Sequence, residues 1–310
     1  MSPMRGRFAP SPTGTLHLGN LRTAMLAWLF ARSARSTFSL RFEDLDQATV
    51  RPAHYDSQRR DLERLGLDWD DELRQSDHLD RYQAALAHLT EVGATYPCYC
   101  SRREIRQAAS APHNDLGARL YPGTCRDLTT KERCDRERGG RTPAIRLRSE
   151  GAEIGFPDRV CGLTTGQVDD AVLARRDGVP AYNLVVVVDD AYQQIEEVVR
   201  GDDLLASTPC HLLIARLLGA PPPTYAHVPL VLGAGGSRLA KRDGAVTLDD
   251  RLHRGDSIAD LVTLLAASAG ISTMREAGAV PTMAELATRF EPAALRRTPW
   301  QLSDADLGAT

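Results

Sequence analysis

The sequence predicts an α/β protein built on a parallel sheet, and three observations support this fold class. Residues 7–20 have the pattern of a short strand, a turn rich in proline and glycine, and the beginning of a helix. Residues 37–43 alternate apolar and polar side chains, which is typical of a half-buried strand. From residue 98 to about residue 177 the composition changes to cysteines, arginines and short alternating segments. We therefore expect two halves of one sheet with an insertion between them.

The expected organisation has four parts. The 310 residues of the chain are enough for a main domain and a smaller inserted domain. We expect the first half of the sheet domain at 1–97 and the insertion, of α+β type, at 98–180. The second half then follows at 181–232, and a basic loop with small helices occupies 233–310.

Composition excludes several classes of protein. Hydrophobic residues make up 42% of the chain and charged residues 25%, as in ordinary soluble domains, and no apolar run approaches the roughly 20 residues of a membrane helix. No apolar segment of a secretory signal precedes residue 7, so we expect a cytoplasmic protein without membrane contact. A net charge of −3 argues against indiscriminate binding of nucleic acid but allows a local basic face.

The turn before the first helix is suited to holding a phosphate. Leu21, Ala24 and Trp28 recur at helical spacing, so the turn leads directly into the N-terminus of a helix. Such an end presents free backbone N–H groups and a partial positive charge. His17 and Asn20 lie where their side chains can add donors. Taken alone, however, a single histidine near a turn is more often structural than catalytic.

A longer match gives this stretch a specific interpretation. His17-Leu18-Gly19-Asn20 resembles the HIGH tetrapeptide of class I aminoacyl-tRNA synthetases, and residues 7–14 resemble the form found in glutamyl enzymes. The resemblance implies a class I, Rossmann-type catalytic fold. It also implies that His17, Gly19 and Asn20 bind ATP, and that the segment before them lines a glutamate pocket with Arg7, Phe8, Ala9, Pro10 and Ser11.

A second segment resembles the other class I signature, KMSKS. It is Arg238-Leu239-Ala240-Lys241-Arg242, which follows a glycine-rich run and departs from the signature at Arg238 and Ala240. Together the two signatures imply that glutamate is activated by ATP with Mg²⁺. His17 and Asn20 would act at the α-phosphate and Lys241 at the leaving pyrophosphate.

The remaining pocket residues follow from charge. Arginine binds carboxylates bidentately, so Arg7 and Arg200 are assigned to the two carboxylates of glutamate. Glu43, at the end of the predicted strand 37–43, is assigned to the ammonium group, although a solvated turn carboxylate is the simpler interpretation without the resemblance. The resemblance implies that Tyr182 faces the amino-acid pocket, where Tyr182 and Ser11 would supply hydrogen bonds. Propensity predicts a strand at 185–188, whereas the resemblance implies a helix there.

Cysteines in the insertion predict one structural zinc ion. Cys98, Cys100 and Cys125 supply three thiolates, and chemistry alone would make Cys134 the fourth ligand. The match to short paralogues of glutamyl-tRNA synthetases instead implies Tyr121, four residues before Cys125. Phenolate is an uncommon ligand, because its pKa of about 10 must be lowered by the ion.

The acceptor is expected to be an anticodon base. About 70 residues follow the second signature, too few for the anticodon-binding part of a complete glutamyl-tRNA synthetase. The resemblance to the short paralogues implies transfer of glutamate to queuosine in the anticodon loop of tRNA(Asp), by a monomer, with a basic face that includes Arg102, Arg103 and Arg106. Two alternatives remain: a truncated synthetase that charges a tRNA 3′ end, and an inactive RNA-binding relic, for which Ala240 is the only indication.

Overall fold

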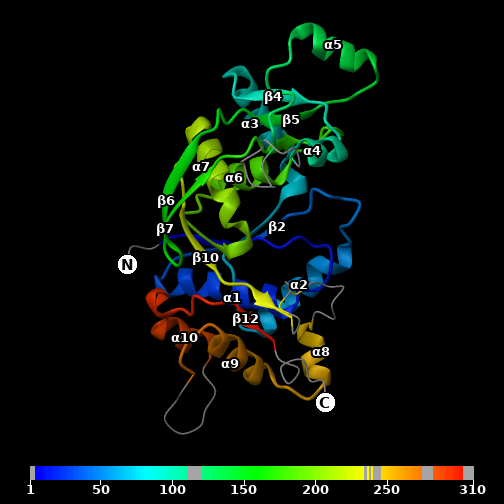
Figure 1. Ribbon diagram of the computed structural model, residues 1–310. Coiled ribbons are helices and arrows are strands. Elements are labelled where there is room, and N and C mark those ends of the chain that lie inside the picture. The colour runs from blue at the N-terminus through cyan, green and yellow to red at the C-terminus, as the bar shows by residue number, and fades with distance from the viewer. Residues whose placement is uncertain are drawn as a thin grey trace.

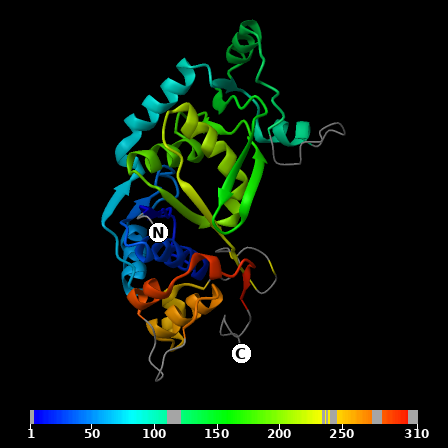
Figure 2. The same cartoon turned by 90° about the vertical axis from the view of Figure 1, so that its left-hand side faces the viewer.

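A computed structural model describes residues 4–109, 121–233, 236, 239, 246–273 and 282–302, without the side chains of 106–109. Parallel strands lie in the middle of an elongated molecule (Figures 1 and 2). A lobe at one end contains β4 (Thr95–Cys98), α4 (Arg102–Ala109), α5 (Thr130–Arg138) and β5 (Ala144–Leu147). Three helices lie at the other end: α8 (Leu248–His253), α9 (Ile258–Ser268) and α10 (Met283–Arg289).

The predicted parallel sheet is present in two adjoining parts. In the first, β2 (Phe38–Phe42) pairs in parallel with both β1 (Gly6–Phe8) and β3 (Asp71–Arg74). In the second, β9 (Glu197–Gly201) pairs in parallel with β10 (Thr224–Val228). The amides of Glu196 and Glu197 donate to the carbonyl of Arg5, at 2.9 and 3.1 Å, which brings the beginning of β9 beside that of β1.

Strands from the region 98–180 form a hairpin and a small sheet. β6 (Glu153–Asp158) pairs antiparallel with β7 (Gly162–Gln167), and Asp158 also pairs in parallel with Tyr225 of β10. Antiparallel pairing joins β4 to β5 and β5 to β8 (Val172–Ala174). The hairpin is therefore continuous with the central strands, whereas the small sheet belongs to the lobe. A further parallel pair is β11 (Val231–Leu232) with β12 (Trp300–Gln301).

Helix α1 (Leu18–Ser33) is buried along almost its whole length. It packs against β1 and β9 on one side and against α9 and α10 on the other, where the rings of Phe30 and Phe290 meet edge to face at 5.1 Å. The other helices are α2 (Pro52–Arg64), α3 (Leu79–Glu91), α6 (Tyr182–Tyr192) and α7 (Thr208–Leu217), with short 3₁₀ turns η1 (Gln75–His78), η2 (Asp202–Ser207) and η4 (Pro292–Ala294). Within the described residues, no helix combines the length and apolar character needed to cross a bilayer.

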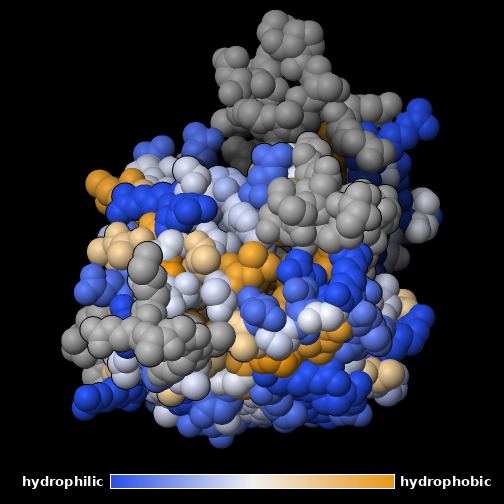
Figure 3. All heavy atoms as spheres, turned by 90° about the horizontal axis from the view of Figure 1, so that it is seen from below, coloured by the Kyte–Doolittle hydropathy of each residue, from blue (hydrophilic) through white to orange (hydrophobic). Residues whose placement is uncertain are grey.

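Hydrophilic and apolar side chains are distributed unevenly over the lower face of the molecule. Figure 3 shows hydrophilic residues mainly at the margins of this face and apolar residues nearer its middle.

At residues 185–188 the structure decides between the two alternatives, in favour of the helix that the resemblance implies, and at strand β2 it corrects the prediction. Residues 185–188 lie in helix α6, not in a strand, because all four valines are buried in a core shared with α3 and α7, and this packing outweighs their strand propensity. Strand β2 is buried at all five positions and is not half-buried. Its polar positions Ser39 and Arg41 also face inward, where Arg41 pairs with carboxylates.

Candidate active site

His17 is the N-cap of α1 and is held in a reciprocal pair with Asn20. The Asn20 amide donates to His17 Nδ1 at 3.2 Å, and the His17 amide donates to Asn20 Oδ1 at the same distance. Because Nδ1 accepts, a neutral His17 ring carries its proton on Nε2. Gly19 lies beneath the ring: a Cβ at this position would stand 2.9 Å from His17 Cε1, so glycine is required for this arrangement.

The turn before α1 is fixed by residues that follow much later in the chain. Gln58 of α2 donates through Nε2 to the carbonyls of Ser11 and Gly14, at 3.0 and 2.7 Å. The amide of Glu43 donates to the carbonyl of Pro10 at 3.0 Å. The turn therefore lies against the carboxyl end of β2, as expected for a ligand crevice in a parallel sheet.

A cavity of about 560 Å³ opens beside this turn. The described residues that were expected to bind glutamate or ATP all line this cavity: Arg7, Phe8, Ala9, Pro10, Ser11, His17, Gly19, Asn20, Glu43, Tyr182 and Arg200. Thr13, Gln58 and Leu204 line it as well. The structure thus brings together residues that are up to 193 positions apart, from Arg7 to Arg200.

Lys241 and Ala240 lie outside the described residues, and Leu239 and Val246 are the nearest described positions on either side of them. Leu239 is buried and lines the cavity, and its amide donates to the carbonyl of Val231 at 3.3 Å. On the other side, the carbonyl of Val246 accepts a hydrogen bond of 3.0 Å from the amide of Leu18. Leu239 and Val246 therefore lie next to the first signature.

Beneath the cavity lies a buried network of charges. Arg7 donates through Nε to Asp190 Oδ1 at 3.3 Å, and Arg41 donates through Nη1 to the same oxygen at 2.6 Å. Burial alone would raise the pKa of Asp190, but the two guanidinium groups hold it below its ordinary value. Arg41 Nη2 also reaches Glu43 Oε1 at 3.4 Å. Burial raises the pKa of Glu43, and Arg41 and Arg7 oppose that rise.

Arg200 has a different environment. It is 5% exposed and donates only to uncharged groups of the described chain: Tyr182 OH, His211 Nδ1, His227 Nε2, the carbonyl of Leu204, Ser207 Oγ and Thr208 Oγ1. The bonds to Tyr182 and Leu204 are long, at 3.3 Å each, and both of these partners line the cavity. A carboxylate entering the cavity can replace these weaker acceptors.

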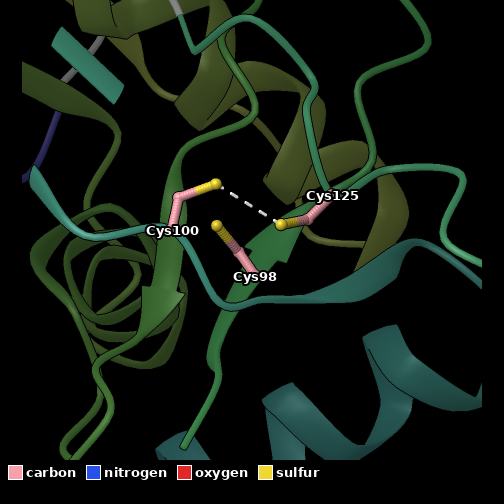
Figure 4. Close-up of side chains that lie close together, drawn as sticks. All are labelled: Cys98, Cys100 and Cys125. Carbon is pink, nitrogen blue, oxygen red and sulfur yellow. Dashed lines mark hydrogen bonds between the residues drawn. The ribbon is translucent and has the colours of Figure 1, made fainter. Parts of the chain in front are cut away.

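The candidate metal centre lies in the lobe. The sulfur atoms of Cys98, Cys100 and Cys125 all lie within 4.8 Å of one another (Figure 4), and the sulfur atoms of Cys100 and Cys125 are 3.4 Å apart. The hydroxyl of Tyr121 lies 3.4 Å from Cys98 Sγ and 3.5 Å from Cys100 Sγ. Cys134 is exposed on α5 and is not part of the cluster. Three thiols and one phenol fit the four positions of a tetrahedral zinc site.

Sequence reasoning missed several residues that shape the cavity: Arg41, Gln58, Asp158, Asp190 and His227. Arg41 lies between Leu40 and Phe42 in an alternating segment, which predicted a solvent-facing position. Asp158, Asp190 and His227 become relevant only through partners far away in the sequence. One signal was available, since Asp189-Asp190 follows four valines and a buried segment rarely ends in carboxylates without partners.

The fold and the signature together define the class of protein. A family model described as tRNA synthetases class I (E and Q), catalytic domain, matches residues 3–308. The glutamate tRNA ligase of Elizabethkingia meningosepticum, in a crystal structure in complex with its amino acid, superposes with a TM-score of 0.82. It is 25% identical, over 98% of this chain and 68% of its own. The protein is thus a ligase with the class I aminoacyl-tRNA synthetase fold.

Relatives in sequence define the family more closely. The glutamyl-Q tRNA(Asp) synthetase of Nocardia farcinica is 54% identical over 97% of this chain and 94% of its own length. That of Symbiobacterium thermophilum is 47% identical over 86% of each chain. The glutamate–tRNA ligase of Aquifex aeolicus is 41% identical over 80% of this chain and 53% of its own. The chain therefore belongs to the glutamyl-Q tRNA(Asp) synthetase family.

Proposed function

We propose that the protein activates L-glutamate with ATP, without needing tRNA, and transfers the glutamyl group to the cyclopentene-diol of queuosine in the anticodon loop of tRNA(Asp). The observation that carries this proposal is the cavity, in which the His17 turn faces two arginines and Glu43. Two guanidinium groups and one carboxylate match the two carboxylates and the ammonium group of glutamate.

In the first step, a carboxylate oxygen of glutamate attacks the α-phosphorus of ATP. A carboxyl–phosphate bond forms, the bond to pyrophosphate breaks, and glutamyl-adenylate results. The amide end of α1, with His17 and Asn20, stabilises charge on the α-phosphate. Lys241 is assigned to the leaving pyrophosphate. Magnesium accompanies ATP and neutralises phosphate charge.

In the second step, a hydroxyl of the queuosine diol attacks the carbonyl carbon of the adenylate. An ester forms, AMP leaves with the electron pair of the broken bond, and the hydroxyl proton is released. Within the cavity, Arg7 and Arg200 hold the substrate carboxylates, Glu43 holds the ammonium group, and Ser11 and Tyr182 add hydrogen bonds. These roles fit the position of each side chain on the cavity wall.

Support for queuosine comes from the relatives. The relative from Nocardia farcinica is named for glutamyl-Q and aligns over 94% of its length, whereas the glutamate–tRNA ligase of Aquifex aeolicus aligns over 53% of its length. The alternative, charging of a tRNA 3′ end, rests on the shared catalytic fold.

Labelled glutamate separates these two acceptors. We expect labelling of tRNA(Asp) that contains queuosine, no labelling of the same tRNA without queuosine, and retention of label after removal of the 3′ adenosine. Labelling that persists without queuosine, or that depends on the 3′ adenosine, would favour a truncated synthetase. Glutamate-dependent ATP–pyrophosphate exchange excludes the third possibility, an inactive RNA-binding relic.

The lobe is proposed to hold one zinc ion, bound by Cys98, Cys100, Cys125 and Tyr121. Burial raises the pKa of the Cys100 thiol to about 11, so an ion has to displace the proton to bind there. With four protein ligands, the ion has no open position for water, and its role is structural.

A further inference from the structure

Two histidines face Arg200 in opposite tautomers. His227 Nδ1 lies 2.6 Å from Asp158 Oδ2, so Nδ1 carries the proton, and His227 Nε2 accepts from Arg200 Nε at 3.1 Å. His211 Nε2 lies 3.0 Å from Asn183 Oδ1, and its Nδ1 lies 3.2 Å from Arg200 Nη1. Each ring therefore directs a lone pair at the guanidinium group. A proton added to either ring at that nitrogen would replace an attraction by a repulsion.

Asp158 is itself firmly held. Its Oδ1 accepts from the amides of Val160 and Cys161 at 2.9 and 2.8 Å, and the amide of His227 donates to its carboxylate at 3.2 Å. Burial alone would raise the pKa of Asp158, but these bonds and the bond from the His227 ring hold it below its ordinary value. Asp158 thus remains an anion whose position is fixed by the backbone around the β6–β7 turn.

We propose that Asp158 and His227 act in series as positioning residues for substrate recognition: the carboxylate fixes the tautomer of His227, and the Nε2 lone pair of His227 orients Arg200 toward the substrate carboxylate. This inference rests on the proposed function, in which Arg200 binds glutamate. His227 is fully buried and does not itself line the cavity, and its ring reaches the cavity wall through Arg200.

The neutral His227 ring, which lies between Asp158 and Arg200, leaves the positive charge of Arg200 available to substrate. Arg7 contacts the carboxylate of Asp190 directly, which neutralises much of its charge before substrate arrives. Arg200 is separated from Asp158 by the width of an imidazole ring, so it is oriented without being neutralised. Burial and the neighbouring Arg200 lower the pKa of His227 although Asp158 opposes the shift, which agrees with a neutral ring. Arg200 therefore retains the positive charge with which it binds a substrate carboxylate. A neutral amide in the same place would not need that charge.

Variants of Asp158, His227 and Arg200 test this chain of contacts through ATP–pyrophosphate exchange. In Asp158→Asn the side-chain amide presents hydrogen to His227 Nδ1, favours the opposite tautomer, and turns an N–H toward Arg200. We expect the KM for glutamate to rise about 10- to 100-fold, as for a lost bond to a charged group, while the KM for ATP stays unchanged. Arg200→Ala gives the upper limit of this effect.

The variants His227→Gln and His227→Asn distinguish the role of Nε2 from that of Nδ1. The amide of glutamine can place its oxygen near the position of Nε2 and rescue the bond to Arg200, whereas asparagine reaches only the position of Nδ1. We expect glutamine to remain closer to wild type in glutamate KM than asparagine. When Asp158→Asn is combined with His227→Gln, we expect no further rise in the KM for glutamate, because Asp158 acts through the histidine ring.

Asp170→Asn is the matched control. Asp170 is another buried carboxylate of the region 98–180, bonded to Tyr96, Ser149 and Arg126, and it does not line the cavity. It should lower the melting temperature without changing the glutamate KM. A full effect of Asp158→Asn in the His227→Gln background, or an equal rise in the KM for ATP, would overturn the inference.

The wild-type protein gives a test that does not depend on the variants folding. Nitrogen-15 NMR of the histidine rings should show His227 protonated at Nδ1 and His211 protonated at Nε2, both neutral at pH 7. A His227 ring protonated at Nε2 contradicts the inference. If wild-type protein shows no glutamate-dependent exchange, the proposed function fails; if it shows exchange but the variants keep the wild-type glutamate KM, only the positioning role fails.

Discussion

Position 19 has space for hydrogen and not for a methyl group. In Gly19→Ala the new Cβ would approach His17 Cε1 to 2.9 Å and Nδ1 to 3.0 Å, so the ring must move away from the Asn20 amide. We expect the rate of ATP–pyrophosphate exchange to fall at least about tenfold, the loss of roughly one hydrogen bond to a charged centre. Alanine favours a helix over glycine by about 1 kcal/mol, so thermal melting should show no comparable loss. An undiminished exchange rate would mean that the ring orientation is not needed.

Asp190 forms ion pairs with Arg7 and Arg41, so its replacement should strongly lower the free energy of unfolding. Removing one partner of a buried ion pair costs about 3–5 kcal/mol, so Asp190→Asn should lower the free energy of unfolding by an amount of that order at pH 7. Because the folded pKa of Asp190 is lowered, its contribution is complete above the unfolded value of about 3.9 and is lost as the pH falls through the folded value.

Urea unfolding between pH 7 and acid pH checks this prediction. The difference between wild type and Asp190→Asn should shrink as the wild-type carboxylate protonates. Asp177→Asn, at an exposed pair with Arg175, serves as the control and should behave like wild type throughout. A difference that is the same at pH 7 and in acid would assign the loss to packing instead.

Individual residues show where sequence reasoning succeeds. His17, Glu43, Tyr182 and Arg200 line one cavity, as the resemblance to glutamyl synthetases implied, although local pattern alone left a structural His17 and a solvated Glu43 as the simpler interpretations. The buried position of Arg41 could not be predicted, since an arginine between Leu40 and Phe42 indicates a surface position unless its buried partners are known. Its partner Asp190 lies 149 positions further along the chain.

At the scale of elements, the same limit applies to α6. Four consecutive valines favour a strand by propensity, and only burial against α3 and α7 decides for a helix. The thiol cluster shows the opposite case. Spacing alone identified three of its members, but chemistry alone favoured Cys134, which is exposed, over Tyr121, whose hydroxyl lies beside the sulfur atoms.

Metal content of single variants tests the proposed zinc site. Cys98→Ser, Cys125→Ser and Tyr121→Phe should each lower bound zinc, whereas Cys134→Ser, the control on α5, should retain one ion per chain. Retention of zinc in Tyr121→Phe together with its loss in Cys134→Ser would reverse the assignment. Chelation should increase hydrogen exchange in β4 and β5 but leave β1 and β2 protected, because these strands belong to separate sheets.

For the molecule as a whole, we predict activation of glutamate without RNA. The described cavity wall contains all four side chains proposed to hold the charged groups of glutamate or to bond to them: Arg7, Glu43, Tyr182 and Arg200. Hydrogen bonds within the chain already hold these side chains in place. Glutamate-dependent ATP–pyrophosphate exchange should therefore proceed at full rate in RNA-free protein, and added tRNA(Asp) should not stimulate it. Strict dependence on tRNA would show that RNA helps to assemble the pocket.

The burial of α1 has a consequence for how strongly its end can act on a phosphate. Its 16 residues run between strands and C-terminal helices, with apolar side chains on nearly every side. Water and mobile ions, which normally weaken the field of a helix dipole, are excluded along the buried stretch 24–31. The N-terminal end of the helix opens into the cavity beside His17. Its contribution to holding the nucleotide should therefore depend far less on ionic strength than that of a lysine in water.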